Sequence, residues 1–165
     1  MHKKTAMLKS NAIFSKDRIY RYSLIRIWDS SKPLLHISGL NPSTADETED
    51  DPTIRREIQF AVELGYGGLC KTNAFAFRAT QPRVMKRQAN PVGAENDRYI
   101  LEASKKSGMS IAAWGIHGNH HGRDQEMYRL HIDWYCFGFT KGGHPRHPLY
   151  LPKTIRPIRV SNARA

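Results

Sequence analysis

Apolar and polar residues alternate along the chain in blocks that predict strands and helices in turn. Residues 34–38 form a short apolar run that stops at Gly39, the pattern of a buried central strand. Similar runs predict three further buried strands, at residues 68–72, 109–114 and 134–139. Residues 20–28, with aromatic and β-branched side chains between two arginines, predict a partly exposed edge strand.

Segments with helical periodicity separate these strands. Asp51, placed before a proline, predicts the start of a helix whose apolar positions share one face up to Gly65. A second helix is expected from Asn90 to Gly108, and a third over residues 123–130. This alternation predicts an α/β fold of three layers, in which helices cover both faces of a mostly parallel sheet of four to five strands.

Polar, glycine-rich and histidine-rich segments follow the four predicted central strands. Ligands of such sheets lie beyond the carboxyl ends of the strands. We therefore expect one shared site, built from residues 39–44, 73–77, 114–115 and 144–148.

Length and hydropathy set the class of protein. The 165 residues suit a single domain, with a core at about 18–152 and a basic tail at 153–165. No apolar stretch has the length of a signal peptide or a membrane span, and the two cysteines lie in apolar runs typical of buried free thiols. We expect a cytoplasmic protein without membrane contact and without a cofactor.

The charge distribution points to a polyanionic partner. The formal net charge is +11, from 26 Lys and Arg against 15 Asp and Glu, and five of the acids lie within residues 46–51. The remaining surface is therefore strongly basic and suits phosphate contacts. Nucleic acid, DNA in particular, is the expected partner; a charge that only maintains solubility is the alternative.

The turn Gly39-Leu40-Asn41-Pro42-Ser43 is the first candidate for catalysis and for substrate binding. Glycine permits close approach of a ligand to the backbone, and proline fixes the turn, so that Asn41 presents its amide from a defined position. The alternative is an ordinary Asn-Pro turn whose side chains bond the local backbone.

The next strand end offers a binding group and an aromatic ring. Asn73 carries amide donors and an acceptor, and can bond the edge of a nucleobase at two atoms. Phe75 is a candidate stacking surface, although a core position is the simpler interpretation.

Histidines and acids add further candidates. His144 and His147, flanked by prolines, are suited to donating a hydrogen bond or a proton at a fixed place, with a structural role as the alternative. His117 and His121 have the spacing of zinc ligands on a helix, but the glycines around them favour a loop. Residues 46–51 could hold magnesium, although a solvated loop at a helix start is the commoner meaning of such a run. We assign no metal to either group.

Six motifs closely resemble an uncharacterised family of bacterial and phage proteins, domain of unknown function 1643. The resemblance covers the chain from about residue 20 to residue 152. The six motifs lie at residues 39–46, 50–56, 73–78, 90–93, 113–115 and 143–150.

The order of strand-end motifs is also similar to the uracil-DNA glycosylase superfamily: Gly-x-Asn-Pro, Asn, Trp-Gly and His-Pro, each after a strand. This resemblance implies that Asn41 holds the water that attacks the sugar C1′, and that Asn73 reads the extruded base. His147, or as second choice His144, would stabilise negative charge on the departing base.

The same resemblance implies the fold and the reaction. Leu149 or Tyr150 would fill the gap that an extruded base leaves in the duplex. We therefore expect a uracil-DNA glycosylase-like fold that excises or recognises uracil, a mismatched pyrimidine or a modified base. The alternatives are a non-catalytic nucleic-acid-binding module on the same fold and a metal-dependent hydrolase of nucleotides or phosphate compounds.

Overall fold

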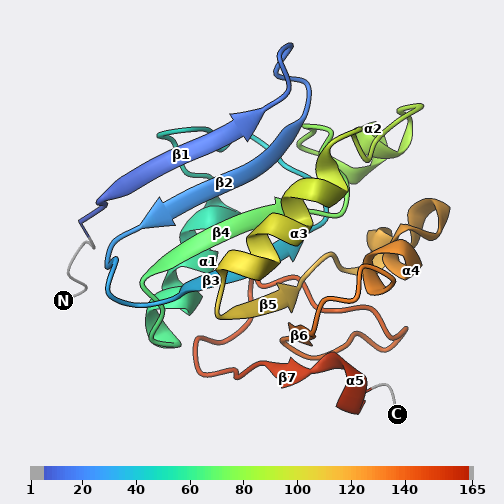
Figure 1. The fold of residues 1–165 in the computed structure, drawn as a ribbon. Helices are drawn as coiled ribbons and strands as arrows, with labels where there is room; N and C mark the ends of the chain where they lie inside the picture. Colours follow the sequence, from blue (N-terminus) through green and yellow to red (C-terminus); the bar gives the residue numbers. More distant parts are fainter. Residues whose placement is uncertain (1–5, 164–165) are drawn as a thin grey trace.

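A seven-stranded sheet forms the centre of the protein, in the order β1-β2-β4-β3-β5-β6-β7 (Figure 1). The structure, a computed structural model, describes residues 6–163. The strands are β1 (Lys9–Phe14), β2 (Arg21–Ile27), β3 (Leu34–Gly39), β4 (Gly68–Asn73), β5 (Met109–Ala112), β6 (Trp134–Cys136) and β7 (Ile158–Arg159).

The sheet is mixed rather than mostly parallel. Its four inner strands β4, β3, β5 and β6 pair in parallel, while β1, β2 and β7 join through antiparallel pairs. The predicted α/β class is confirmed, but the sheet has seven strands instead of four or five. The two strands missing from the prediction carry little pattern, because β1 begins with three exposed residues and β7 has only two residues.

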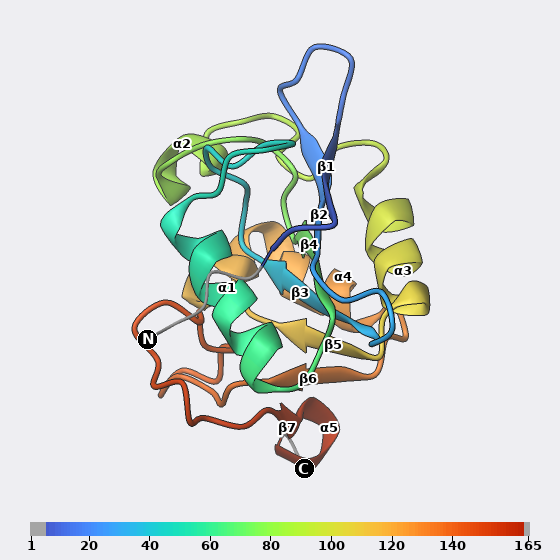
Figure 2. The same ribbon diagram turned by 90° about the vertical axis from the view of Figure 1, so that its left-hand side faces the viewer.

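Helices cover both faces of this sheet, as expected. They are α1 (Pro52–Glu63), α2 (Pro82–Lys86), α3 (Asn96–Lys106), α4 (Arg123–Tyr128), α5 (Val160–Ala163) and the 3-10 helix η1 (Ile116–Gly122). Figure 2 shows α1 and α3 on opposite sides of the sheet. Apolar side chains of α1 and the sheet form one core, and α3 packs on the other.

Three expectations about position need correction. The strand predicted at the edge of the sheet is β2, which lies inside it because β1 pairs along its outer side. The helix expected to start at Asn90 is α3, which begins at Asn96. The sheet also extends past both limits expected for the core, since β1 precedes residue 18 and β7 comes from the segment interpreted as a basic tail.

Two other sequence expectations concern composition. Cys70 and Cys136 are buried free thiols, as predicted. Within residues 6–163, no helix has the length and apolar character needed to cross a bilayer.

Backbone hydrogen bonds hold together the segments that leave the parallel strands. The N–H of Ala74 donates to Gly39 O at 2.8 Å, so the chain after β4 continues beside the chain after β3. The N–H of Gly115, after β5, donates to Pro145 O at 2.9 Å. The segments after β3, β4, β5 and β6 therefore meet at one rim of the sheet.

Candidate functional site

A cavity of about 580 Å³ opens at this rim, a volume within the range of small-molecule sites. Its walls come from the segment after β3, the start of α1, the ends of β4 and β5, and the loop after β6. Seven of the predicted site residues line it: Leu40, Asn41, Pro42, Ser43, Asn73, His147 and Leu149.

Asn41 uses one half of its amide to fix the turn. Its Nδ2 donates to Ala79 O at 2.8 Å and to Pro42 O at 3.2 Å. The Oδ1 atom accepts no hydrogen bond from any residue in the described part of the chain. The donor half is thus structural, and Oδ1 is left for a ligand or a water molecule in the cavity.

Asn73 is held at the cavity floor by its backbone. Its carbonyl oxygen accepts a hydrogen bond from Asn96 Nδ2 at 2.9 Å, which fixes the end of β4. The side chain is only 2% exposed, and its Nδ2 has no partner within residues 6–163. A buried donor without a protein partner is costly, so this amide is available to an acceptor on a ligand or to water.

His147 faces the cavity as a neutral donor. Its Nδ1 accepts the backbone N–H of Leu149 at 3.2 Å, which leaves the proton of the neutral ring on Nε2. Burial among the cavity walls lowers the pKa of His147 to about 4, and the positive charge of Lys71 lowers it further. The residue is exposed and lines the cavity, so Nε2–H is accessible to a ligand.

A buried ion pair that the sequence analysis missed supports the cavity floor. Lys71 Nζ, on β4, lies 2.5 Å from Glu57 Oε1, on the inner face of α1, and both side chains are less than 5% exposed. Gly39 makes room for this contact, because a Cβ there would lie 2.5 Å from Lys71 Nζ. The sequence did contain a signal for this pair: Lys71 interrupts an otherwise apolar strand. A charged side chain in such a position needs a buried partner of opposite charge.

Two further N–H groups increase the number of donors at the cavity. Arg21 is 2% exposed and donates from Nη1 to Ala45 O at 2.9 Å, but its Nε has no partner within the described residues. Burial lowers the pKa of Arg21 to about 10, so it remains a cation at neutral pH. The Nε1 of Trp114 is also buried and without a partner there. Both residues line the cavity, which therefore favours a ligand rich in acceptor atoms.

Residues 21–149 match the sequence profile of DUF1643, a protein family of unknown function. The chain belongs to this family. Comparison with curated proteins and with solved structures finds no match. The matched region of this DUF1643 protein contains all the residues that line the cavity.

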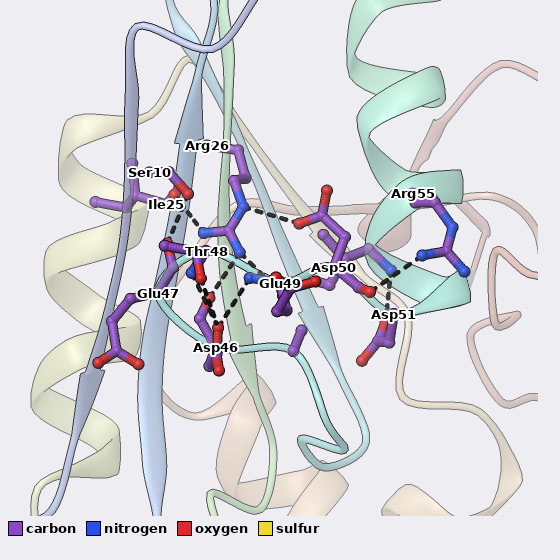
Figure 3. Close-up of polar contacts among 12 residues, drawn as sticks. Ser10, Ile25, Arg26, Asp46, Glu47, Thr48, Glu49, Asp50, Asp51 and Arg55 are labelled. Atoms are coloured by element: carbon purple, nitrogen blue, oxygen red, sulfur yellow. Dashed lines mark hydrogen bonds and ion pairs between the residues drawn. The ribbon is translucent and has the colours of Figure 1, made fainter.

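The acidic loop, residues 46–51, makes its polar contacts with other residues of the protein. Arg26, 1% exposed, donates from Nε to Asp50 at 2.8 Å and from Nη2 to the carbonyl oxygen of Asp46 at 2.6 Å (Figure 3). The Asp46 carboxylate accepts two backbone N–H groups of the loop, and Glu47 pairs with Arg18 at 2.7 Å. Most of the loop carboxylates thus have a protein partner. Across residues 6–163, no group of three or more His, Cys, Asp or Glu side chains is arranged to hold a metal ion.

The proposed zinc spacing of His117 and His121 does not lie on one regular helix. η1 is interrupted at His121, whose φ is 52°, which agrees with the loop interpretation. His117 instead lies beside Lys86, with Nδ1 and Nζ 2.8 Å apart. Burial and then this ammonium group lower the pKa of His117.

Four predicted site residues do not line the cavity of the DUF1643 domain. Gly39 lies under Lys71, as described above. Phe75 is fully buried in the core on the α3 side, because it follows β4 on the face away from the cavity. His144 is bonded through its backbone to Thr140, and Tyr150 is 93% exposed. Phe75 and His144 thus lie outside the cavity, whereas the exposed Tyr150 remains a candidate for the gap in a duplex.

Proposed function

We propose that this DUF1643 protein cleaves the N-glycosidic bond of an altered base extruded from DNA. The observation that carries the proposal is that Asn41, Asn73 and His147, three residues far apart in the sequence, line one cavity of about 580 Å³. The parallel order β4-β3-β5-β6 supports it, because each of these strands ends next to one of the motifs that resemble those of uracil-DNA glycosylases.

Each of the three residues has a role that its contacts permit. Oδ1 of Asn41 is free to orient the attacking water, since its Nδ2 is used by the turn. The unpartnered Nδ2 of Asn73 is free to bond an acceptor on the base. The neutral Nε2–H of His147 would stabilise the negative charge that the base acquires as the C1′–N bond breaks. Leu149, at the cavity wall, or the exposed Tyr150 would fill the gap in the duplex.

Formation of abasic sites tests the proposal directly. Oligonucleotides carrying uracil, a mismatched thymine or a modified pyrimidine are incubated with the protein, and abasic sites are cleaved with alkali and counted. We expect one of these bases to be excised, with a rate about 10²–10³-fold lower in His147→Ala, because one preorganised donor is lost.

His144→Ala is the matched control, since His144 lies in the same loop but does not line the cavity. It should retain the wild-type rate. If the protein binds these oligonucleotides and releases none of the bases, the glycosylase proposal fails.

In that case a second function remains, a nucleic-acid-binding module without catalysis. It is favoured by Arg83 and Lys86, two cations beside the cavity opening without an ion-pair partner among the described residues. For such a module, binding would weaken steeply with salt, and His147→Ala would not alter it.

A further inference from the structure

Asp51 differs from the other carboxylates of the acidic loop because it faces the cavity. It is the N-cap of α1, and one of its oxygens, Oδ1, accepts the backbone N–H of Ile54 at 2.9 Å. Its side chain is largely buried, with 8% of the residue exposed. Among the described residues that line the cavity, Asp51 is the only one with a carboxylate.

The second oxygen of Asp51 is uncommitted. No residue within 6–163 donates a hydrogen bond to Oδ2 or forms an ion pair with the carboxylate. The charge is nevertheless close to the other cavity groups, because it raises the pKa of Arg21 and opposes the lowering of the pKa of His147. A carboxylate fixed at one oxygen by a helix start thus presents the other oxygen to the cavity.

The chemistry of glycosidic cleavage needs such a group. Positive charge develops on the sugar as the C1′–N bond breaks, and the attacking water must lose a proton. Oδ1 of Asn41 can orient this water, but a neutral amide is a poor proton acceptor. The cavity donors, such as Nδ2 of Asn73, can stabilise negative charge on the base but cannot take a proton from the water.

We propose that Asp51 is a catalytic residue of this site, whose free carboxylate oxygen takes the proton of the attacking water. The water oxygen forms a bond to C1′, and the C1′–N bond breaks with its electron pair passing to the base. Asp51 receives one water proton and becomes neutral, while the departing base is stabilised by Nε2–H of His147. Return of that proton to the base or to solvent restores the carboxylate. This inference rests on the proposed glycosylase function.

Asp51→Asn separates catalysis from capping. Asparagine is as good an N-cap as aspartate, so this variant should keep the urea midpoint of the wild type. We expect its single-turnover rate of abasic-site formation to fall about 10²–10⁴-fold, the range for loss of a general base. Its affinity for the same oligonucleotide, measured with an uncleavable sugar analogue, should change less than about threefold.

Two control variants complete the experiment. Asp124→Asn removes a partly exposed carboxylate from the first turn of α4, outside the cavity, and should retain the wild-type rate. Asp51→Ala removes both cap and charge, and should lose stability as well as activity.

Wild-type cleavage by Asp51→Asn would overturn the inference, since Asp51 would then only cap α1. Equal losses of affinity and rate would also overturn it, because the charge would then serve binding. Absence of cleavage by the wild-type protein on every altered base would instead overturn the proposed function and the inference together. The wild-type result alone therefore separates the two failures.

Discussion

Polar groups of two kinds are buried in the sheet and under α1. Lys71 and Glu57 neutralise one another, although burial still raises the pKa of Glu57. His36, on β3, is buried uncharged: its Nδ1 lies 2.9 Å from Ser110 Oγ, and its Nε2 lies 2.8 Å from Thr72 Oγ1. Burial lowers the pKa of His36 to about 3, with Lys71 adding to the effect.

Acid should therefore destabilise the protein through His36. A folded-state pKa below the unfolded value of about 6.5 means that the unfolded chain binds more protons, so stability is complete above about pH 6.5 and is lost as the pH falls toward the folded pKa. For His36 the loss is on the order of 3 kcal/mol by about pH 4.5. Urea unfolding across this range measures it.

The variant His36→Gln removes the titrating ring and should reduce this acid sensitivity. His147→Gln should also reduce the acid sensitivity, by a smaller amount, because the pKa of His147 is lowered to about 4. If NMR shows the His36 ring of the folded protein titrating near pH 6.5, the expected linkage is wrong.

At the scale of elements, the acidic loop is held in place by Arg26. The guanidinium contacts Asp50 as well as the carbonyl oxygens of Asp46 and Glu49, at 2.8, 2.6 and 3.2 Å. The loop leads directly into the cap of α1, so the same contacts determine where Asp51 enters the cavity. The acidic loop therefore binds the buried guanidinium of Arg26, and this contact describes it better than a metal-ion site does.

We expect Arg26→Lys to weaken the contacts that hold the acidic loop, because one ammonium group cannot replace a planar guanidinium with several donors. The free energy of unfolding should fall by about 2–4 kcal/mol. Backbone amides of residues 46–50 should exchange with deuterium faster. Arg55→Lys is the control, since Arg55 is more exposed and makes a single contact with the loop, to Asp50 O. Unchanged exchange in Arg26→Lys would contradict this description.

At the scale of the molecule, positive charge borders the cavity. A hollow beside the opening is lined by Arg83, Lys86 and His117, and it shares His117 and Pro82 with the cavity. The net charge of +11 is thus accompanied by a local concentration of cations where a nucleic acid strand would enter.

Reversing these charges should weaken DNA binding. Arg83→Glu with Lys86→Glu should lower the affinity for unmodified DNA at least about tenfold and reduce the salt slope by roughly 1–2, as phosphate contacts are lost. The matched control is Lys105→Glu with Lys106→Glu, at the end of α3 and before β5, on the opposite rim of the sheet. Equal losses in both variants, measured by fluorescence anisotropy, would argue against a DNA-facing opening.

The sequence by itself determined the local elements and the rim of the sheet. Apolar runs specify β3, β4 and β5, and an aspartate before a proline specifies the start of α1, because burial and capping act on neighbouring residues. The alternation of these elements places Asn41, Asn73 and His147 at or after the carboxyl ends of the parallel strands β3, β4 and β6. Their convergence at one cavity could be predicted for that reason.

Only the tertiary structure decided which polar groups share the cavity and which way they face. The Lys71–Glu57 pair joins a strand to a helix. The strands β1 and β7 are defined by their pairing with β2 and with the three-residue strand β6. Asp51 has the same cap signature whether or not it faces a cavity. It lines the same cavity as Asn41 only because α1 packs on the sheet, and no local pattern encodes that packing.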